Sequence, residues 1–492
     1  MAQDNLLPPH LEANFPDMVG FVQRVRAFSA QHSFFSPDRP IYVARAPGRL
    51  DLMGGNDDYT GGLVFEATIH EATRVAVQRR SDSQVLFANP QVQAMGWHDS
   101  VEYSLDDLWH AGQVHPIEQI HALLRSRPGQ EWTAYVLGDL YFLMKQFPEQ
   151  ITGGISIFLE SDVPIGKGVS SSAALEVAGM KAIAAAYGIR AEGVPLALWC
   201  QWVENAIAQS ASGVMDQITV VMGDRDHLLP LVCQPCQPEP LVRLPAPLRY
   251  WAIDSGVRHA VSGIEYEAAR AATFMGYRII CDSENLPLIL DESDVLARWV
   301  DPRWKGYLAN LSPSEYRARF ETLLPEKMTG AEFSARYPVH ADPYTVVRPE
   351  VVYPVRACTR YAVEENHRVR LFVELLSHRQ EPLTERTIEL LGELMYQSHY
   401  AYTECGLGSA ATDLIVDLVK AEGVAHGLYG AKVTGGGAGG TVAILGVQSE
   451  QAQEAFERVV SRFEQETGYK PYLFEGSSPG ADRFGVLEIH LP

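Results

Sequence analysis

Three glycine-rich stretches hold most of the side chains with which this chain could carry out chemistry. They read "PGRLDLMGGNDDYTGG" at 47–62, "VPIGKGVSSSAALE" at 163–176 and "YGAKVTGGGAGGTVAILG" at 429–446. Glycine allows backbone amides to approach a ligand closely, and the polar side chains between the glycines can then bind hydroxyls or phosphates. For the first stretch taken alone, an ordinary turn is the alternative, because its Gly-Asn and Asp-Asp-Tyr-Thr-Gly-Gly sequences also suit turns.

The middle stretch is typical of a phosphate-binding loop. A strand-like run precedes it and an apolar helical run follows, so loop amides and the positive end of a helix would point to one place. The Walker pattern G-x-x-x-x-G-K-[ST] is absent. The hydroxyls at 170–172 can reach phosphate or magnesium, whereas a helix cap needs only one of them. A solvated loop lysine is the alternative for Lys167. The predicted phosphate-binding residues are Gly166, Lys167, Gly168, Ser170, Ser171 and Ser172.

Asp216, in the sequence "GVMDQ", is a second candidate for chemistry. It falls in the first turn of a predicted helix, where the helix dipole would keep the carboxylate ionised, as a base that accepts a hydroxyl proton should be. A helix-start carboxylate without a catalytic role is the alternative.

Alternating strands and helices must hold these loops in place. A leading helix is predicted over residues 11–35, a strand enters the first glycine-rich loop, and helices are predicted over 359–376 and 383–422. Residues 282–355 resist assignment. The proline-rich run "CQPCQPEPLVRLPAPLRY" predicts a domain boundary, which divides the chain into residues 1–236 and 237–492.

Composition limits the classes of partner. The chain has 492 residues, 46% of them hydrophobic and 21% charged, which is typical of a globular protein. A net charge of -21 argues against nucleic acid or an anionic membrane as a partner. The N-terminus lacks a basic region followed by an apolar one, so a cytoplasmic location is expected. Six cysteines in so long a chain do not make a disulfide framework, and "CQPC" lacks a second pair of metal ligands.

The order of four motifs resembles that of a known superfamily. "PGRLDLMGGNDDYTGG", "VPIGKGVSSSAALE", "GVMDQ" and "GAKVTGGGAGGTVAIL" are similar to the signatures of galactokinases, homoserine kinases, mevalonate kinases and phosphomevalonate kinases, over roughly residues 40–490. The sequence "VRHAVSGIEY" at 257–266 points to the sugar 1-kinase branch. The resemblance implies a ribosomal-protein-like α/β N-terminal domain and a ferredoxin-like α+β C-terminal domain, with the active site in the cleft between them.

The same resemblance implies an activity and its central residues. The activity is phosphorylation of the anomeric hydroxyl of a monosaccharide, with ATP and Mg²⁺ as cofactors. Asp216 would be the catalytic carboxylate and Arg49 its cationic partner, which would hold Asp216 ionised and stabilise charge on the transferring phosphoryl group. Ser172 and Glu204 match the magnesium ligands of the family, and a hydroxyl and a carboxylate suit that ion.

Further positions match residues near the substrates. Those expected at the sugar are Asp58, Tyr266, Gly55 and Asn56, and those expected in a third loop near the substrates are Gly435, Gly436 and Gly437.

Gly55 and Asn56 depart from the galactokinase pattern, which usually has Glu-His there. This departure resembles the kinase domain of L-arabinokinases. L-Arabinopyranose has the ring stereochemistry of galactose without the exocyclic carbon, so a buried Glu-His pair would lack its hydroxyl partner. On this reasoning, Gly55→Glu with Asn56→His would shift selectivity toward galactose.

Three hypotheses therefore remain from the sequence. The first is an L-arabinose 1-kinase, the second is a galactokinase or another hexose 1-kinase, and the third is a non-catalytic sugar sensor on the same fold. The presence of both Arg49 and Asp216 disfavours the sensor.

Overall fold

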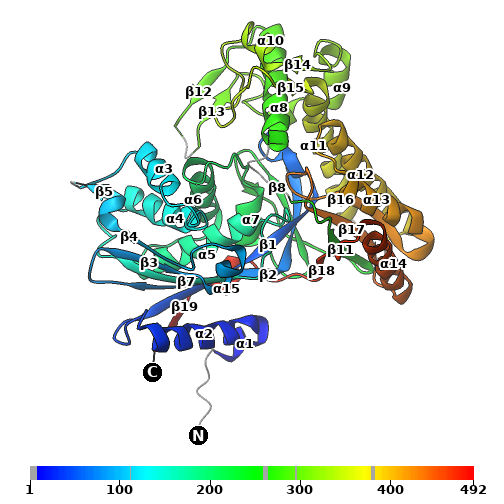
Figure 1. Ribbon diagram of the computed structural model, residues 1–492. Coiled ribbons are helices and arrows are strands. Elements are labelled where there is room, and N and C mark those ends of the chain that lie inside the picture. Colours follow the sequence, from blue (N-terminus) through cyan, green and yellow to red (C-terminus); the bar gives the residue numbers. More distant parts are fainter. Residues whose placement is uncertain (1–7, 111, 259–263, 294–295, 378–382, 492) are drawn as a thin grey trace.

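The computed structural model describes residues 8–110, 112–258, 264–293, 296–377 and 383–491. It has two parts, each a β-sheet with helices packed against it (Figure 1). The first part contains a large mixed sheet and the second a smaller antiparallel one. No helix in these ranges combines the length and the apolar character needed to cross a lipid bilayer. None of the six cysteines forms a disulfide, and all six are buried.

The large sheet carries the first glycine-rich loop. Its strands are β1 (Ile41–Met53), β2 (Leu63–Arg79), β3 (Gln84–Ala88), β4 (Ser100–Ser104), β7 (Ile155–Ser161), β8 (His227–Val232), β9 (Gln237–Pro238), β10 (Val242–Arg243) and β19 (Leu487–Ile489). The order is β10-β8-β2-β7-β3-β4, with β1 beside β2 and β19, and β9 beside β8. Only β3 and β7 run parallel among the described pairs of this sheet. Strands β9 and β10 of this sheet lie after residue 236, and β19 is the last described strand of the chain.

Helices cover this sheet on both faces. One face packs against α3 (Ile117–Arg125), α4 (Thr133–Gln146), α5 (Ser171–Ala186), α6 (Gly193–Ala206) and α7 (Met215–Met222), and the other against α1 (Pro9–Asn14) and α2 (Asp17–His32) (Figure 1). Two helices thus replace the single helix expected over 11–35, because Pro16 interrupts the run. Helix α5 is rich in alanine, so it packs closely on β1 and β2 and brings its N-terminus to the end of the first loop.

The smaller sheet carries the third glycine-rich loop. Its strands are β11 (Leu248–Asp254), β16 (Leu428–Val433), β17 (Thr441–Val447) and β18 (Leu473–Phe474), in the order β16-β17-β11-β18. It packs against α12 (Glu385–Glu404), α13 (Ala410–Glu422) and α14 (Glu450–Thr467). One helix was expected over 383–422, but α12 and α13 are separate, since Gly406 adopts a φ of 82° between them.

Residues 282–293 and 296–355 form an irregular layer on α8 (Ile264–Ser283) and α11 (Val355–Ser377) (Figure 1). Further short strands and α-helices in the described ranges are β5 (Trp109–His110), β6 (Gln113–Val114), β12 (Ile289–Asp291), β13 (Arg298–Val300), α9 (Pro313–Glu315), β14 (Met328–Thr329), α10 (Gly330–Ser334), β15 (Val352–Tyr353) and α15 (Ala481–Phe484). Short 3-10 or π helices are η1 (Gly55–Asp57), η2 (Pro90–Met95), η3 (Leu105–Asp107), η4 (Leu308–Asn310), η5 (Tyr316–Phe320) and η6 (Val424–His426).

One apolar cluster joins the two parts. It combines Met53 and Phe65 of the large sheet with Phe372 of α11 and Leu445 of β17, all buried. Because burying such side chains stabilises a fold by about 1.5–3 kcal/mol each, this contact fixes the two parts relative to each other. It also fixes the loops that lie between them.

Candidate active site

A cleft of about 400 Å³ lies where the glycine-rich loops meet. The predicted site residues that line it are Arg49, Asn56, Asp58, Gly166, Gly168, Ser170, Ser171, Ser172, Glu204, Asp216, Tyr266 and Gly436. Gly55, Lys167, Gly435 and Gly437 lie behind this surface. Residues 259–263 of the "VRHAVSGIEY" motif are outside the described ranges, but the exposed Arg258 beside them lines the cleft.

Arg49 and Asp216 form an ion pair in the cleft. The Nε atom of Arg49 donates to Oδ1 of Asp216 at 2.9 Å, and its Nη2 atom makes a shorter bond to the same oxygen. Arg49 also donates from Nη1 to the carbonyl of Gly168 at 3.1 Å. The arginine is buried, whereas the Asp216 side chain is 18% exposed. The pair therefore presents one partly open carboxylate to the cleft.

Electrostatics keep Arg49 charged. Burial alone would lower the pKa of Arg49, but the negative charges of Asp216 and Glu66 outweigh it and raise that pKa. The carboxylate of Glu66 lies 3.5 Å from Nε of Arg49. Burial and the nearby charge of Asp51 raise the pKa of Glu66 well above its usual value. The carboxylate of Asp216 is thus paired with a guanidinium that stays charged.

The middle loop brings hydroxyls and a helix N-terminus to the cleft. Ser170 precedes α5 with a left-handed φ of 61°, which is uncommon outside glycine and recurs at functional sites. Its buried hydroxyl oxygen has no hydrogen-bond partner among the described residues. An unpartnered hydroxyl beside free helix amides fits an anion such as phosphate.

The amino group of Lys167 points away from this loop. Its Nζ atom donates to Oδ2 of Asp254 at 2.5 Å and to the hydroxyl of Tyr469 at 3.0 Å, both in the second part of the chain. The hydroxyl of Thr441 donates to the carbonyl of Lys167 at 2.8 Å. Through these hydrogen bonds, Lys167 connects the middle loop to the smaller sheet.

Glu204 and Ser172 lie together near the helix N-terminus. Burial, and then the charge of Asp216, raise the pKa of Glu204 to about 7, although hydrogen bonds from Ser172 and Ser212 oppose the shift. Ser212 and Gln217 donate to the same oxygen of Glu204, at 2.9 and 2.5 Å. A buried carboxylate next to a hydroxyl, with Asp216 nearby, is a set of hard oxygen donors that fits Mg²⁺.

Asp58 and Tyr266 line the cleft on the side away from the middle loop. Burial, and then the charge of Asp216, raise the pKa of Asp58 to about 7. Arg270 lies close to both residues and forms a buried two-pronged pair with Asp342, at 2.8 and 3.0 Å. The carboxylate of Asp58 also lies so close to Gly213 that a Cβ atom there would be 1.8 Å away. Carboxyl and phenol groups in a buried wall suit the binding of sugar hydroxyls.

The raised pKa of Asp58 predicts a pH-dependent stability. The folded protein retains this proton up to about pH 7, whereas the unfolded chain releases it near pH 4. The contribution of Asp58 to the free energy of unfolding is therefore greatest at low pH. It falls by up to about 4 kcal/mol as the pH rises to 7. Asp58→Asn should remove much of this decrease in the free energy of unfolding, as measured by urea denaturation between pH 4.5 and 8.5. Asp82→Asn, at an exposed position, is the control; equal slopes for Asp58→Asn and the parent would contradict the assignment.

Tyr402 occupies the space that a glutamate at position 55 would need to bind an exocyclic hydroxyl. A Cβ atom at Gly55 would lie 1.6 Å from the hydroxyl oxygen of Tyr402 and 2.6 Å from its Cζ atom. Gly55 also has a φ of 39°, which disfavours any other residue. The exchange Gly55→Glu with Asn56→His, suggested by sequence alone, therefore has no room in this fold.

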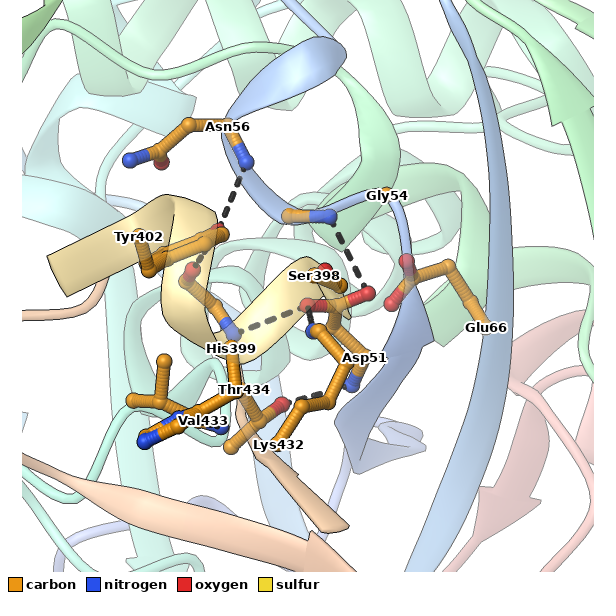
Figure 2. Close-up of polar contacts among 12 residues, drawn as sticks. Asp51, Gly54, Asn56, Glu66, Ser398, His399, Tyr402, Lys432, Val433 and Thr434 are labelled. Atoms are coloured by element: carbon orange, nitrogen blue, oxygen red, sulfur yellow. Dashed lines mark hydrogen bonds and ion pairs between the residues drawn. The ribbon is translucent and has the colours of Figure 1, made fainter. Parts of the chain in front are cut away.

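The third loop contacts both other loops. A Cβ atom at Gly435 would lie 3.0 Å from the carbonyl oxygen of Gly168 and 3.2 Å from Nη1 of Arg49. Its position is fixed by Asp51, which accepts a hydrogen bond from the Gly435 amide at 3.2 Å and pairs with Lys432 at 2.6 Å (Figure 2). The loop thus forms part of the floor of the cleft.

An aromatic pocket adjoins the cleft and was not predicted from the sequence. Trp97, Tyr135 and Ile165 line both cavities, and Trp132 and Leu175 line the aromatic pocket alone. A flat apolar pocket next to a phosphate-binding loop suits a nucleobase. The only sequence signal was the aromatic content of the run "WTAYVLGDLYFLMKQF", which is equally typical of a core helix.

Known proteins are similar to this chain in sequence. Three family profiles match in order: galactokinase galactose-binding signature at residues 31–79, GHMP kinases N terminal domain at 134–224 and GHMP kinases C terminal at 380–465. An L-arabinokinase of Arabidopsis thaliana is 38% identical over 508 residues, covering 94% of this chain and 48% of that protein, so the chain spans about half its length. A galactokinase of Chloroflexus aggregans is 29% identical over 432 residues, covering 87% and 90% of the two chains.

Solved structures show the same architecture. Lactococcus lactis galactokinase complexed with galactose superposes with a TM-score of 0.69 at 20% identity, covering 91% of this chain and 95% of that one. Methanococcus jannaschii mevalonate kinase gives 0.52 at 13% identity, covering 88% and 98%. The fold and the cleft therefore define a two-domain kinase architecture. The chain belongs to the galactokinase, homoserine kinase, mevalonate kinase and phosphomevalonate kinase (GHMP) superfamily, which confirms the predicted family and fold class.

Proposed function

We propose that this chain is an ATP-dependent sugar 1-kinase that converts L-arabinose to L-arabinose 1-phosphate. The observation that carries the proposal is the Arg49–Asp216 pair, which lies between the middle loop and the wall formed by Asp58 and Tyr266. A carboxylate in that position can accept the proton of a sugar hydroxyl on one side while a phosphate binds on the other. This pair gives no support to a sensor that only binds sugar.

In the proposed reaction, Asp216 accepts the proton of the anomeric hydroxyl. The anomeric oxygen bonds to the γ-phosphorus of ATP while the bond to the bridging oxygen breaks, and ADP and the sugar 1-phosphate leave. Arg49 pairs with Asp216 and offsets charge on the moving phosphoryl group. The amides at the start of α5 and the hydroxyls of residues 170–172 bind the phosphates.

Ser172 and Glu204 would hold Mg²⁺, which supplies positive charge to the phosphates of ATP when bound. Glu204 is 2% exposed and has its pKa raised by burial, so it becomes a good ligand where a cation replaces the missing charge. The adjoining aromatic pocket would take the adenine base.

The sugar would lie against Asp58 and Tyr266. L-Arabinose is proposed as the first substrate because Gly55 offers no side chain for an exocyclic hydroxyl and because the L-arabinokinase similarity covers 94% of the chain. D-Galactose is the second candidate, favoured by the galactose-binding signature at residues 31–79.

A panel of free sugars tests the proposal. With ATP and Mg²⁺, ADP release should be fastest with L-arabinose, and kcat/KM should exceed that for D-galactose by about 10- to 100-fold, since crowding rejects an added group only moderately. Phosphorus NMR should identify a 1-phosphate, and chelation of Mg²⁺ should stop the reaction. A tenfold preference for D-galactose would overturn the L-arabinose assignment, and no ADP release with any sugar would overturn the kinase assignment.

A further inference from the structure

Tyr402 occupies the space that a side chain at position 55 would need. It lies near the end of α12, is fully buried and points toward the turn that contains Asn56 (Figure 2). The 1.6 Å separation between its hydroxyl oxygen and a Cβ atom at Gly55 means that only glycine fits there while Tyr402 is present.

The hydroxyl of Tyr402 links the first and third glycine-rich loops. It accepts a hydrogen bond from the amide of Asn56 at 2.8 Å and donates one to the carbonyl of Gly435 at 2.6 Å. Burial raises the pKa of Tyr402 well above its usual value, so the hydroxyl remains a donor. The ring is packed edge-on against Tyr361, with centroids 5.1 Å apart. Both bonds are therefore held in one geometry.

These two bonds set the wall of the cleft. Asn56 and Gly436 line the cleft, whereas Tyr402 lies behind them. The side-chain amide of Asn56 donates to the carbonyl of Gly436 at 3.4 Å. Because Tyr402 binds the main chain of Asn56 and of Gly435, it brings the two wall residues together across the boundary between the two parts of the chain.

We propose that Tyr402 is a positioning residue for sugar selectivity: its hydroxyl replaces a side chain at position 55 and closes the wall of the sugar site against an exocyclic substituent. The proposal rests on the proposed sugar-kinase function, and it deepens it by naming the residue that makes this wall admit a pentopyranose better than a hexopyranose. Without the hydroxyl, the Asn56 amide and the Gly435 carbonyl lose a buried partner, so the two loops can move apart.

Tyr402→Phe tests the role of the hydroxyl. The ratio of kcat/KM for L-arabinose to that for D-galactose should fall about 3- to 10-fold, mainly through a lower KM for D-galactose, while KM for ATP changes less than about twofold. The matched control is Tyr141→Phe, whose buried side chain donates from its hydroxyl to the carbonyl of His115 at 2.7 Å and lines neither the cleft nor the aromatic pocket. That control should lower the melting temperature comparably and leave the sugar ratio within about twofold.

A binding measurement separates this proposal from the kinase assignment. Calorimetric titration of L-arabinose and D-galactose, with Mg²⁺ and a non-hydrolysable ATP analogue, does not require phosphoryl transfer. If the parent transfers no phosphate yet binds L-arabinose more tightly and Tyr402→Phe narrows the difference, the kinase assignment fails and this proposal stands.

Other outcomes overturn the role of Tyr402. If the ratio of L-arabinose to D-galactose, in kcat/KM or in affinity, is the same in Tyr402→Phe as in the parent, Tyr402 does not set sugar selectivity. The kinase assignment then stays intact. A parent that binds both sugars equally, or neither, would overturn the role of Tyr402 as well. Should Tyr402→Phe fold too poorly to assay, Asn56→Ala removes the side-chain bond from Asn56 to the carbonyl of Gly436 across the same wall, and it must also narrow the sugar ratio for the proposal to survive.

Discussion

Asp216→Ala should lower kcat about 10²- to 10⁴-fold and leave KM for ATP within about twofold, since a positioned proton acceptor contributes that much. Asp216 contacts Arg49 and faces the cleft, but the proposed nucleotide contacts lie on the middle loop and in the aromatic pocket. Initial rates with saturating L-arabinose and varied ATP give both constants. An unchanged kcat would remove Asp216 from the mechanism.

A matched control is available at another helix start. Asp482 lies in the first turn of α15 and pairs with Lys181 at 2.6 Å, so it shares with Asp216 a helix-start position and a basic partner. Asp482→Ala should reduce stability but keep kcat within about twofold. A loss of kcat equal to that of Asp216→Ala would mean that the effect of Asp216→Ala is structural.

The partnership with Arg49 is tested by the double variant. Arg49→Ala should reduce kcat by a factor comparable with that of Asp216→Ala, and the double variant should lose far less than the product of the two, because groups that act as a unit are not additive. Fully multiplicative losses would contradict the pairing.

The sequence was sufficient to locate the local motifs that carry the proposed site residues, whose roles stay predictions. The three glycine-rich stretches and the helix start at Asp216 each combine glycines or a helix end with polar groups, and the structure places Arg49, Asp58 and Asp216 on one cleft. Each of these motifs is a loop next to a strand or helix whose apolar pattern is visible locally. The family and the fold class could therefore be predicted from their order.

Contacts between distant segments could not be predicted in this way. Nothing near Tyr402 in the sequence indicates that it would fill the space beside Gly55, because the two meet only when α12 packs against the first loop. The orientation of Lys167 toward Asp254 depends likewise on the second part of the chain. The aromatic run around Tyr135 had the periodicity of a core helix, and only the fold shows that part of it faces the cleft.

A buried ion pair between the two parts of the chain should have the largest effect on stability. Asp51 and Lys432 pair at 2.6 Å, and both side chains are 0% exposed (Figure 2). Asp51 also accepts hydrogen bonds from the amides of Gly55 at 3.1 Å and Gly435 at 3.2 Å, and its own amide donates to the hydroxyl of Thr434 at 2.8 Å. The pair therefore joins the loops that form the floor and the sugar end of the cleft.

Lys432→Met should lower the free energy of unfolding by about 3–5 kcal/mol, because it leaves the Asp51 carboxylate buried without its cation and close to Glu66. Asp51→Asn with Lys432→Met should recover part of this loss, since neither side chain is then charged. The recovery is incomplete because the amides of Gly55 and Gly435 bind different oxygens of Asp51, and asparagine has only one oxygen to accept them. Urea denaturation at pH 7.5 measures both. The exposed pair of Arg190 and Glu192 supplies the control, and Arg190→Ala should leave the urea midpoint nearly unchanged. If Lys432→Met unfolds at the same urea concentration as the parent, the buried pair does not hold the two parts of the chain together.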